Sequence, residues 1–295
     1  MEIIRRPCVV SLIALALVPQ ASQAAETVLE PVDKWVLSYA EDSCRLARAF
    51  GKDDDRVVLV LDQFQPGGEM DLSLVGKRFG RSPLSRTGLT ATFGPGLPKA
   101  QLHYALLGTL GPDKTTIIMA GPRDLLNRTH KRTSDDLSDE LRTVTPEQEA
   151  AITEVRFTTS TMRLTLKTGS MKAPLGAMRT CMTNLVKEWG LDPAQQEALS
   201  ARAVATTKPS MWLKPEDYPS GPLFMGASAA IRFRMMVGAD GVPTHCFIQQ
   251  ATNSPEFTKL TCDLLMKRVR FSPALDREGK PVASYYTNSV RWLAP

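Results

Sequence analysis

Apolar and polar residues alternate along Ile231–Val237, near the C-terminal end of the chain, and the neighbouring segment Thr244–Ala251 places Cys246 and Ile248 on one face. The side chains of a β-strand point to opposite faces in turn, so each segment predicts a strand with one buried face. The pair Asp240-Gly241 lies between the two segments and is typical of the tight turn of a β-hairpin. The pattern therefore predicts an antiparallel hairpin.

A helix and one further strand are predicted after this hairpin. The segment Ser254–Glu256 combines a capping serine with a proline at the first helical position. Four apolar residues then recur at helical spacing: Phe257, Leu260, Leu264 and Leu265. The segment Phe271–Pro273 ends this pattern, and Tyr285–Trp292 predicts the last strand. The resulting order is β-β-α-β, with the helix packed on the hairpin.

The longer N-terminal part of the chain is rich in predicted strands. Short apolar or alternating runs, separated by glycine and proline, predict strands over Val57–Leu61, Met70–Val75, Leu89–Phe93, Leu102–Leu107, Thr115–Met119 and Val155–Leu166. Thr145–Glu147 is a helix-start signal. The segment Leu175–Trp189 predicts a helix that ends at Gly190.

The residues between these two parts have a different composition. Residues 203–222 contain four prolines and little apolar periodicity, which favours a linker. We therefore expect an α+β protein with a strand-rich N-terminal domain over residues 25–202, a linker over 203–222 and a small C-terminal domain over 223–295.

The first 24 residues have the pattern of a secretory signal peptide. Two arginines precede the apolar run Cys8–Val18, and Ser22 and Ala24 place small residues before a cleavage point at Ala25. A membrane-spanning helix needs ~20 apolar residues, and this run is shorter. We therefore expect export to the periplasm, with membrane association only if the segment stays uncleaved.

Four of the five cysteines lie after this segment, at Cys44, Cys181, Cys246 and Cys262. An even number in an exported chain indicates two disulfides, for which three connectivities exist. If the predicted helix packs on the hairpin, Cys246 and Cys262 come within bonding distance. By elimination, Cys44 then pairs with Cys181. Buried free thiols are the alternative.

Composition and charge argue against several classes of function. The net charge of +5 is spread along the chain without a dense block of lysine and arginine, so no nucleic-acid partner is expected. The three histidines, His103, His130 and His245, lack the spacing of metal ligands. The chain also lacks a Gly-x-Ser-x-Gly motif. We therefore expect no metal, no cofactor and no enzymatic activity.

Several short segments of the C-terminal part occur in a characteristic order. They are Asp217–Pro219, Ile231–Val237, Asp240–Val242, Arg270–Ala274 and Gly279–Val282. This ordered set resembles the C-terminal domain of the TonB family of energy transducers. The resemblance covers Asp217–Trp292, which is about a quarter of the chain.

The resemblance implies a binding function. In this family the domain binds a short extended segment of outer-membrane transporters, and the physical basis is strand addition to a sheet edge. The expected edge is the last strand, Tyr285–Arg291. The resemblance assigns partner contacts to Tyr218, Pro219, Tyr285, Tyr286, Asn288 and Arg291. The expected partner is therefore an envelope protein, in the first instance a TonB-dependent outer-membrane transporter.

Some features depart from the family's pattern. A typical transducer has an uncleaved membrane helix and a long proline-rich spacer, and it often has glycine where this chain has Ala229. The extra N-terminal domain is also unusual, so a periplasmic protein that reuses the module is expected rather than a true transducer. The alternatives are an exported enzyme with its site in Val32–Leu199 and a purely structural envelope protein. An open edge at Tyr285–Arg291 favours binding, and a covered edge favours the structural role.

Overall fold

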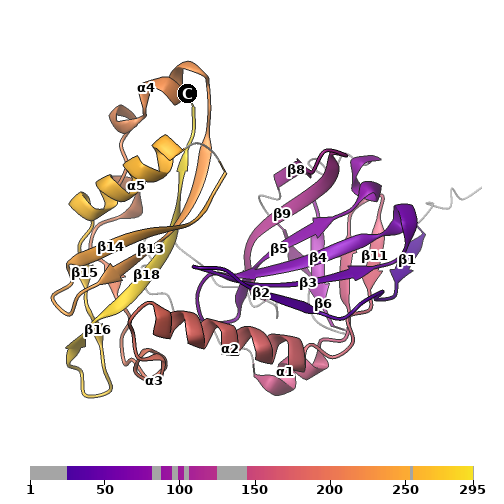
Figure 1. Ribbon diagram of the computed structural model, residues 1–295, viewed down its shortest axis with the longest axis horizontal. Coiled ribbons are helices and arrows are strands. Elements are labelled where there is room, and N and C mark those ends of the chain that lie inside the picture. Colours follow the sequence, from indigo (N-terminus) through magenta and orange to yellow (C-terminus); the bar gives the residue numbers. More distant parts are fainter. Residues whose placement is uncertain are drawn as a thin grey trace, which may run out of the picture.

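The computed structural model describes residues 25–81, 88–94, 99–102, 106–124, 145–252 and 255–294. The predicted signal peptide over residues 1–24, together with His103, His130 and Ser254, lies outside the described residues. The protein is an α+β protein in which sheets predominate and helices are few. Its ribbon forms an N-terminal lobe with most of the strands and a smaller C-terminal lobe (Figure 1).

A six-stranded antiparallel sheet forms the centre of the N-terminal lobe, with the order β2-β3-β4-β5-β9-β8. Its strands are β2 (Val36–Tyr39), β3 (Cys44–Phe50), β4 (Val57–Gln63), β5 (Glu69–Val75), β8 (Leu106–Leu110) and β9 (Thr115–Asp124). Alternate residues of β4, namely Val57, Leu59 and Leu61, are buried in the core of this lobe. The predicted strands at Val57–Leu61 and Met70–Val75 are therefore confirmed.

A second sheet has the order β1-β11-β10-β6-β7. Its strands are β1 (Glu26–Leu29), β6 (Thr90–Phe93), β7 (Ala100–Gln101), β10 (Val155–Thr158) and β11 (Arg163–Leu166). The prediction of one strand over Val155–Leu166 is wrong, because β10 and β11 are two antiparallel strands. The hydroxyl of Thr159 accepts hydrogen bonds from the backbone N–H groups of Thr161 and Met162, and the chain reverses there.

In the described part of this lobe the α-helices are α1 (Pro146–Ala151), α2 (Lys172–Glu188) and α3 (Pro193–Glu197). Thr145 caps α1 as expected, since its hydroxyl accepts from the N–H of Gln148 at 3.2 Å. The predicted helix at Leu175–Trp189 is confirmed as α2. Its buried side contributes Met178, Cys181, Met182 and Leu185 to the core of the N-terminal lobe.

The C-terminal lobe is a three-stranded antiparallel sheet with one long helix. The sheet has the order β14-β13-β18, formed by β13 (Ala229–Val237), β14 (Pro243–Ala251) and β18 (Ser284–Trp292). Helix α5 (Pro255–Arg268) lies along one face of this sheet (Figure 1). The short strands β15 (Phe271–Ser272), β16 (Ala274–Leu275) and β17 (Pro281–Val282) precede β18. The main elements thus follow the predicted strand, strand, helix, strand order.

The segment predicted as a linker, residues 203–222, packs on the C-terminal lobe. Its strand β12 (Val204–Ala205) pairs with β15, and α4 (Ser220–Phe224) follows two short 3-10 helices. Trp212 is 1% exposed and belongs to the C-terminal core. The prolines start short helical turns here, and an apolar side chain anchors the segment, so it is not a free spacer.

Candidate functional site

The expected binding strand, β18, lies at an edge of the C-terminal sheet. Among the strands that the structure describes, it pairs with β13 alone. An edge strand has a row of backbone groups directed away from its sheet, which is the feature that strand addition requires.

Hydrogen bonds of Ala230 define the direction in which the backbone groups of β13 point. The N–H of Ala230 donates to the hydroxyl of Thr252, and its C=O accepts from the N–H of the same residue. Ala230 therefore faces β14. Since successive residues of a strand face opposite sides, Ile231 faces β18, where it is paired with Val290.

The pairing of β13 with β18 has no register shift, so this assignment extends along the whole strand. Asn288 is paired with Phe233 and directs its N–H and C=O toward β13. Thr287, Ser289 and Arg291 alternate with these residues and direct their backbone groups outward. The N–H of Ser289 donates to the side-chain oxygen of Asn288 at 2.8 Å.

Burial divides β18 into two halves. The first half is buried and comprises Ser284, Tyr285, Tyr286 and Thr287. In the second half Ser289 and Arg291 are exposed and Asn288 is half-buried. The part of the edge that is accessible from solvent therefore begins at Asn288.

The N-terminal lobe covers the first half of β18. The ring of Tyr285 meets that of Trp189, at the end of α2, edge to face with their centroids 5.2 Å apart. The hydroxyl of Thr287 donates to the side-chain oxygen of Gln65, in the turn between β4 and β5. The two lobes thus meet at this strand.

Two arginines of β13 fix this junction between the lobes. The guanidinium of Arg234 donates to the carboxylate of Asp42 at 2.6 and 3.1 Å. It also lies 4.1 Å from the ring centroid of Trp189 and 4.3 Å from that of Phe247, within cation–π range. Arg234 is 3% exposed, so the pair is nearly removed from water.

The second arginine, Arg232, donates to both carboxylate oxygens of Asp71 on β5, at 2.8 and 2.9 Å. Its guanidinium lies 4.6 Å from the ring centroid of Phe64. Burial raises the pKa of Asp71 to about 6, although the charge of Arg232 acts in the opposite direction. Asp62 and Glu69 add to the increase by repulsion. The junction therefore contains a carboxyl group that titrates near neutral pH.

The structure turns three of the six predicted contact residues toward the interior. Tyr218 packs between Phe257 and Trp292, each at 5.6 Å between centroids, and its hydroxyl donates to a backbone C=O. Tyr285 packs on the N-terminal lobe, and Tyr286 lies in the C-terminal core. Burial raises the pKa of Tyr285 to about 12.

The other three predicted contact residues lie nearer the surface. Asn288 and Arg291 occupy the accessible half of β18, and Pro219 precedes α4. Sequence reasoning missed Ser289, Arg232 and Arg234. The alternation of β13 indicates which residues share a face, but polar residues on the second face are equally typical of a solvated surface and of a charged junction.

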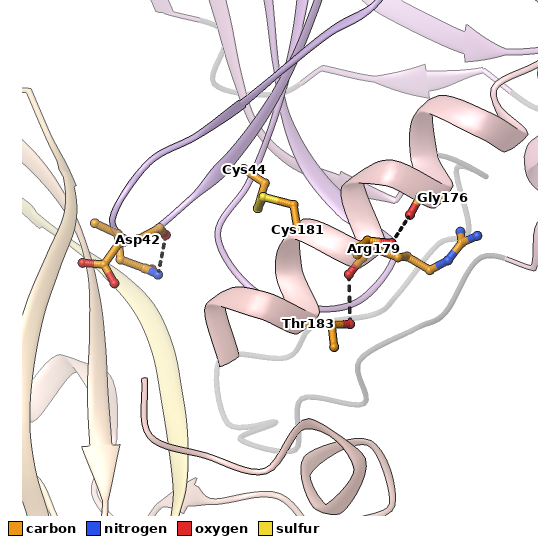
Figure 2. The surroundings of a disulfide bond; sticks show 8 residues. Asp42, Cys44, Gly176, Arg179, Cys181 and Thr183 are labelled. Atoms are coloured by element: carbon orange, nitrogen blue, oxygen red, sulfur yellow. Dashed lines mark hydrogen bonds between the residues drawn. A yellow bond between two sulfur atoms is a disulfide. The ribbon is translucent and has the colours of Figure 1, made fainter. Parts of the chain in front are cut away.

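Both disulfides have the predicted connectivity. Cys44–Cys181 joins the start of β3 to α2, and Cys246–Cys262 joins β14 to α5. The first lies beside the loop that carries Asp42 toward the C-terminal strands (Figure 2). Disulfides persist in oxidising compartments, so they indicate an exported protein.

No protein-family model matches this sequence, and no curated protein matches it. Within the described ranges, no cluster of histidine, cysteine, aspartate and glutamate side chains could hold a metal ion. No helix in the same ranges is both long and apolar enough to cross a membrane.

Proposed function

We propose that this chain is a periplasmic protein that binds an extended peptide segment of an envelope partner by strand addition to β18. The observation that carries the proposal is the position of β18, which pairs with β13 alone among the described strands and is accessible from Asn288 onward. A peptide that pairs there extends the sheet by one strand, and backbone hydrogen bonds supply the affinity.

The accessible half of the edge defines what the partner must offer. The N–H of Ser289 points away from β13, and within the described residues it donates to the neighbouring side chain of Asn288. A partner carbonyl replaces this local bond when it pairs. The first half of β18 contributes less, because Tyr285 and Thr287 contact the N-terminal lobe. The partner segment is therefore short.

The proposed partner is the periplasmic N-terminal segment of a TonB-dependent outer-membrane transporter. Support comes from the ordered motifs between Asp217 and Trp292, which resemble those of the TonB C-terminal domain. The strand, strand, helix, strand order and the two disulfides are consistent with such a module in an exported protein. The N-terminal lobe holds the module through Arg232 and Arg234.

The test uses the full chain with both disulfides formed and synthetic peptides from those transporter segments. Affinity is measured by fluorescence anisotropy for the parent, Ser289→Ala and Ser289→Pro. Ser289→Ala keeps the outward N–H and is expected to bind like the parent. Proline removes that donor but is tolerated at an edge position, so the affinity should fall about threefold to tenfold. Equal binding by the folded proline variant, or no binding of any peptide by the parent, contradicts the proposal.

A further inference from the structure

A cavity of about 460 Å³ lies where the two lobes meet. We call it the junction cavity. Its wall is formed by α2, α3, the turn between β4 and β5, Glu149 of α1, Arg202 and Tyr285 of β18. This volume is within the ~300–1,000 Å³ range of sites for small organic ligands. Because Tyr285 belongs to the C-terminal lobe, a molecule in this cavity contacts both lobes.

Much of the wall is apolar. Leu175, Met182 and Val186 line the cavity from α2, and Met70 lines it from β5. All four are buried side chains. The ring of Tyr285 also lines the cavity. An apolar wall of this extent fits a ligand with a hydrocarbon or aromatic body, since burial of such a body in contact with it is favourable.

The polar part of the wall contains two buried acceptor oxygens without a described donor. The guanidinium of Arg179 is paired with Glu149, and Arg202 lies beside the hydroxyl of Tyr285. One carboxylate oxygen of Glu149 and the side-chain oxygen of Gln63 are buried, and no donor in the described part of the chain reaches either of them. A buried acceptor without a donor is unfavourable, so a ligand that brings N–H groups relieves this cost.

The charges of the wall agree with this polarity. Three carboxylates line the cavity, from Glu149, Asp192 and Glu197, against the two guanidiniums of Arg179 and Arg202. The excess of negative charge favours a cation over an anion of the same size. The other lining amide, that of Gln196, is already used by Ser284 and by the backbone of Ala283.

We propose that the junction cavity binds a small organic primary amine with an apolar body. The ammonium group donates to Glu149 and Gln63, and the apolar body packs on Met182, Val186 and Tyr285. This site is separate from the accessible half of β18 and does not depend on peptide binding there. A bound amine contacts both lobes, so it also stabilises their association.

The test titrates the full oxidised chain with 2-phenylethylamine and, for comparison, 3-phenylpropionate, an anion of similar size. Heat of binding and ligand-observed NMR report the two affinities. The amine is expected to bind saturably at millimolar concentration and at least about tenfold more tightly than the anion. Glu149→Gln should weaken the amine about tenfold, whereas Glu188→Gln, an exposed position of α2 outside the cavity, should bind it like the parent.

A second variant guards against a fold defect in Glu149→Gln. Thr183 lines the cavity but is exposed on the surface of α2, on a different side of the helix from Cys181 (Figure 2). Thr183→Trp therefore fills the cavity without disturbing the core and should abolish amine binding. The proposal is overturned if the parent shows no saturable binding, if the anion binds as well as the amine, or if the folded Thr183→Trp protein retains binding.

Discussion

The two disulfides are expected to differ in their contribution to stability because they close loops of very different length. Cys44–Cys181 spans a sequence separation of 137 residues, and Cys246–Cys262 spans 16. A cross-link stabilises the folded chain mainly by restricting the unfolded one, and this effect grows with the logarithm of loop length. The relation gives about 5 kcal/mol for the first bond and about 3 kcal/mol for the second.

The perturbation is a pair of double variants, Cys44→Ala with Cys181→Ala and Cys246→Ala with Cys262→Ala. The first pair carries an added cost, because Cys44 and Cys181 are 0% exposed and alanine leaves space in the core. The first double variant is therefore expected to lose more free energy of unfolding than the second, by about 2 kcal/mol or more. It should also loosen the loop that carries Asp42 to the junction.

The assay is urea denaturation of both variants and the parent, followed by circular dichroism and by tryptophan fluorescence. Trp35 and Trp189 report on the N-terminal lobe, and Trp212 and Trp292 on the C-terminal lobe. The reasoning is refuted if the short-loop variant is the less stable of the two, or if both variants match the parent.

Three further predictions concern the junction and the edge strand. Because folding raises the pKa of Asp71 to about 6, the folded state binds a proton more tightly than the unfolded state, and the stability from this proton is lost as pH rises through about 6. When pH is lowered from 7 to 5, the free energy of unfolding of the parent, measured in denaturant titrations, should therefore rise by about 1 kcal/mol relative to that of Asp71→Asn. A relative fall would contradict this prediction. Asp42→Ala leaves Arg234 buried without its carboxylate partner and should lower the free energy of unfolding by about 3 kcal/mol. Adding Arg234→Met removes the unpaired charge and should restore part of this loss. If the double variant recovers no stability, an unpaired buried charge is not the cause. Asn288→Pro removes a backbone N–H that faces β13, whereas Ser289→Pro removes one that faces outward. The thermal midpoint of Asn288→Pro should therefore lie well below that of Ser289→Pro. Equal midpoints would overturn the assignment of which N–H groups of β18 face β13.

The sequence carries strong local signals for the C-terminal lobe. Alternation along most of β13, with the turn at Asp240-Gly241, identifies the β13–β14 hairpin, and apolar residues at helical spacing identify α5. The same two patterns place Cys246 and Cys262 on facing elements, which is why their pairing could be predicted. Local periodicity is sufficient where a strand or helix buries one face against its sequence neighbour.

The parts that were not predicted depend on contacts between residues distant in sequence. The parallel pairing of β1 with β11 joins residues 26–29 to residues 163–166, and no local pattern specifies it. The burial of Arg234 arises only when the N-terminal lobe brings Asp42 to it. Trp212 made residues 203–222 part of the C-terminal core, although their prolines are equally typical of a linker. Packing of Ala203, Ala205 and Trp212 in that core, with the pairing of β12 and β15, thus outweighed a compositional signal.

The most direct test of the proposed function is amide hydrogen exchange along β18, measured on the full chain with and without a saturating transporter peptide. Thr287, Ser289 and Arg291 direct their N–H groups outward, whereas Asn288 and Val290 direct theirs toward β13. Strand addition predicts that exchange slows at Ser289 when the peptide binds, while Asn288 and Val290, which face β13, change little. Unchanged exchange at Ser289 in the bound protein would contradict binding at this edge.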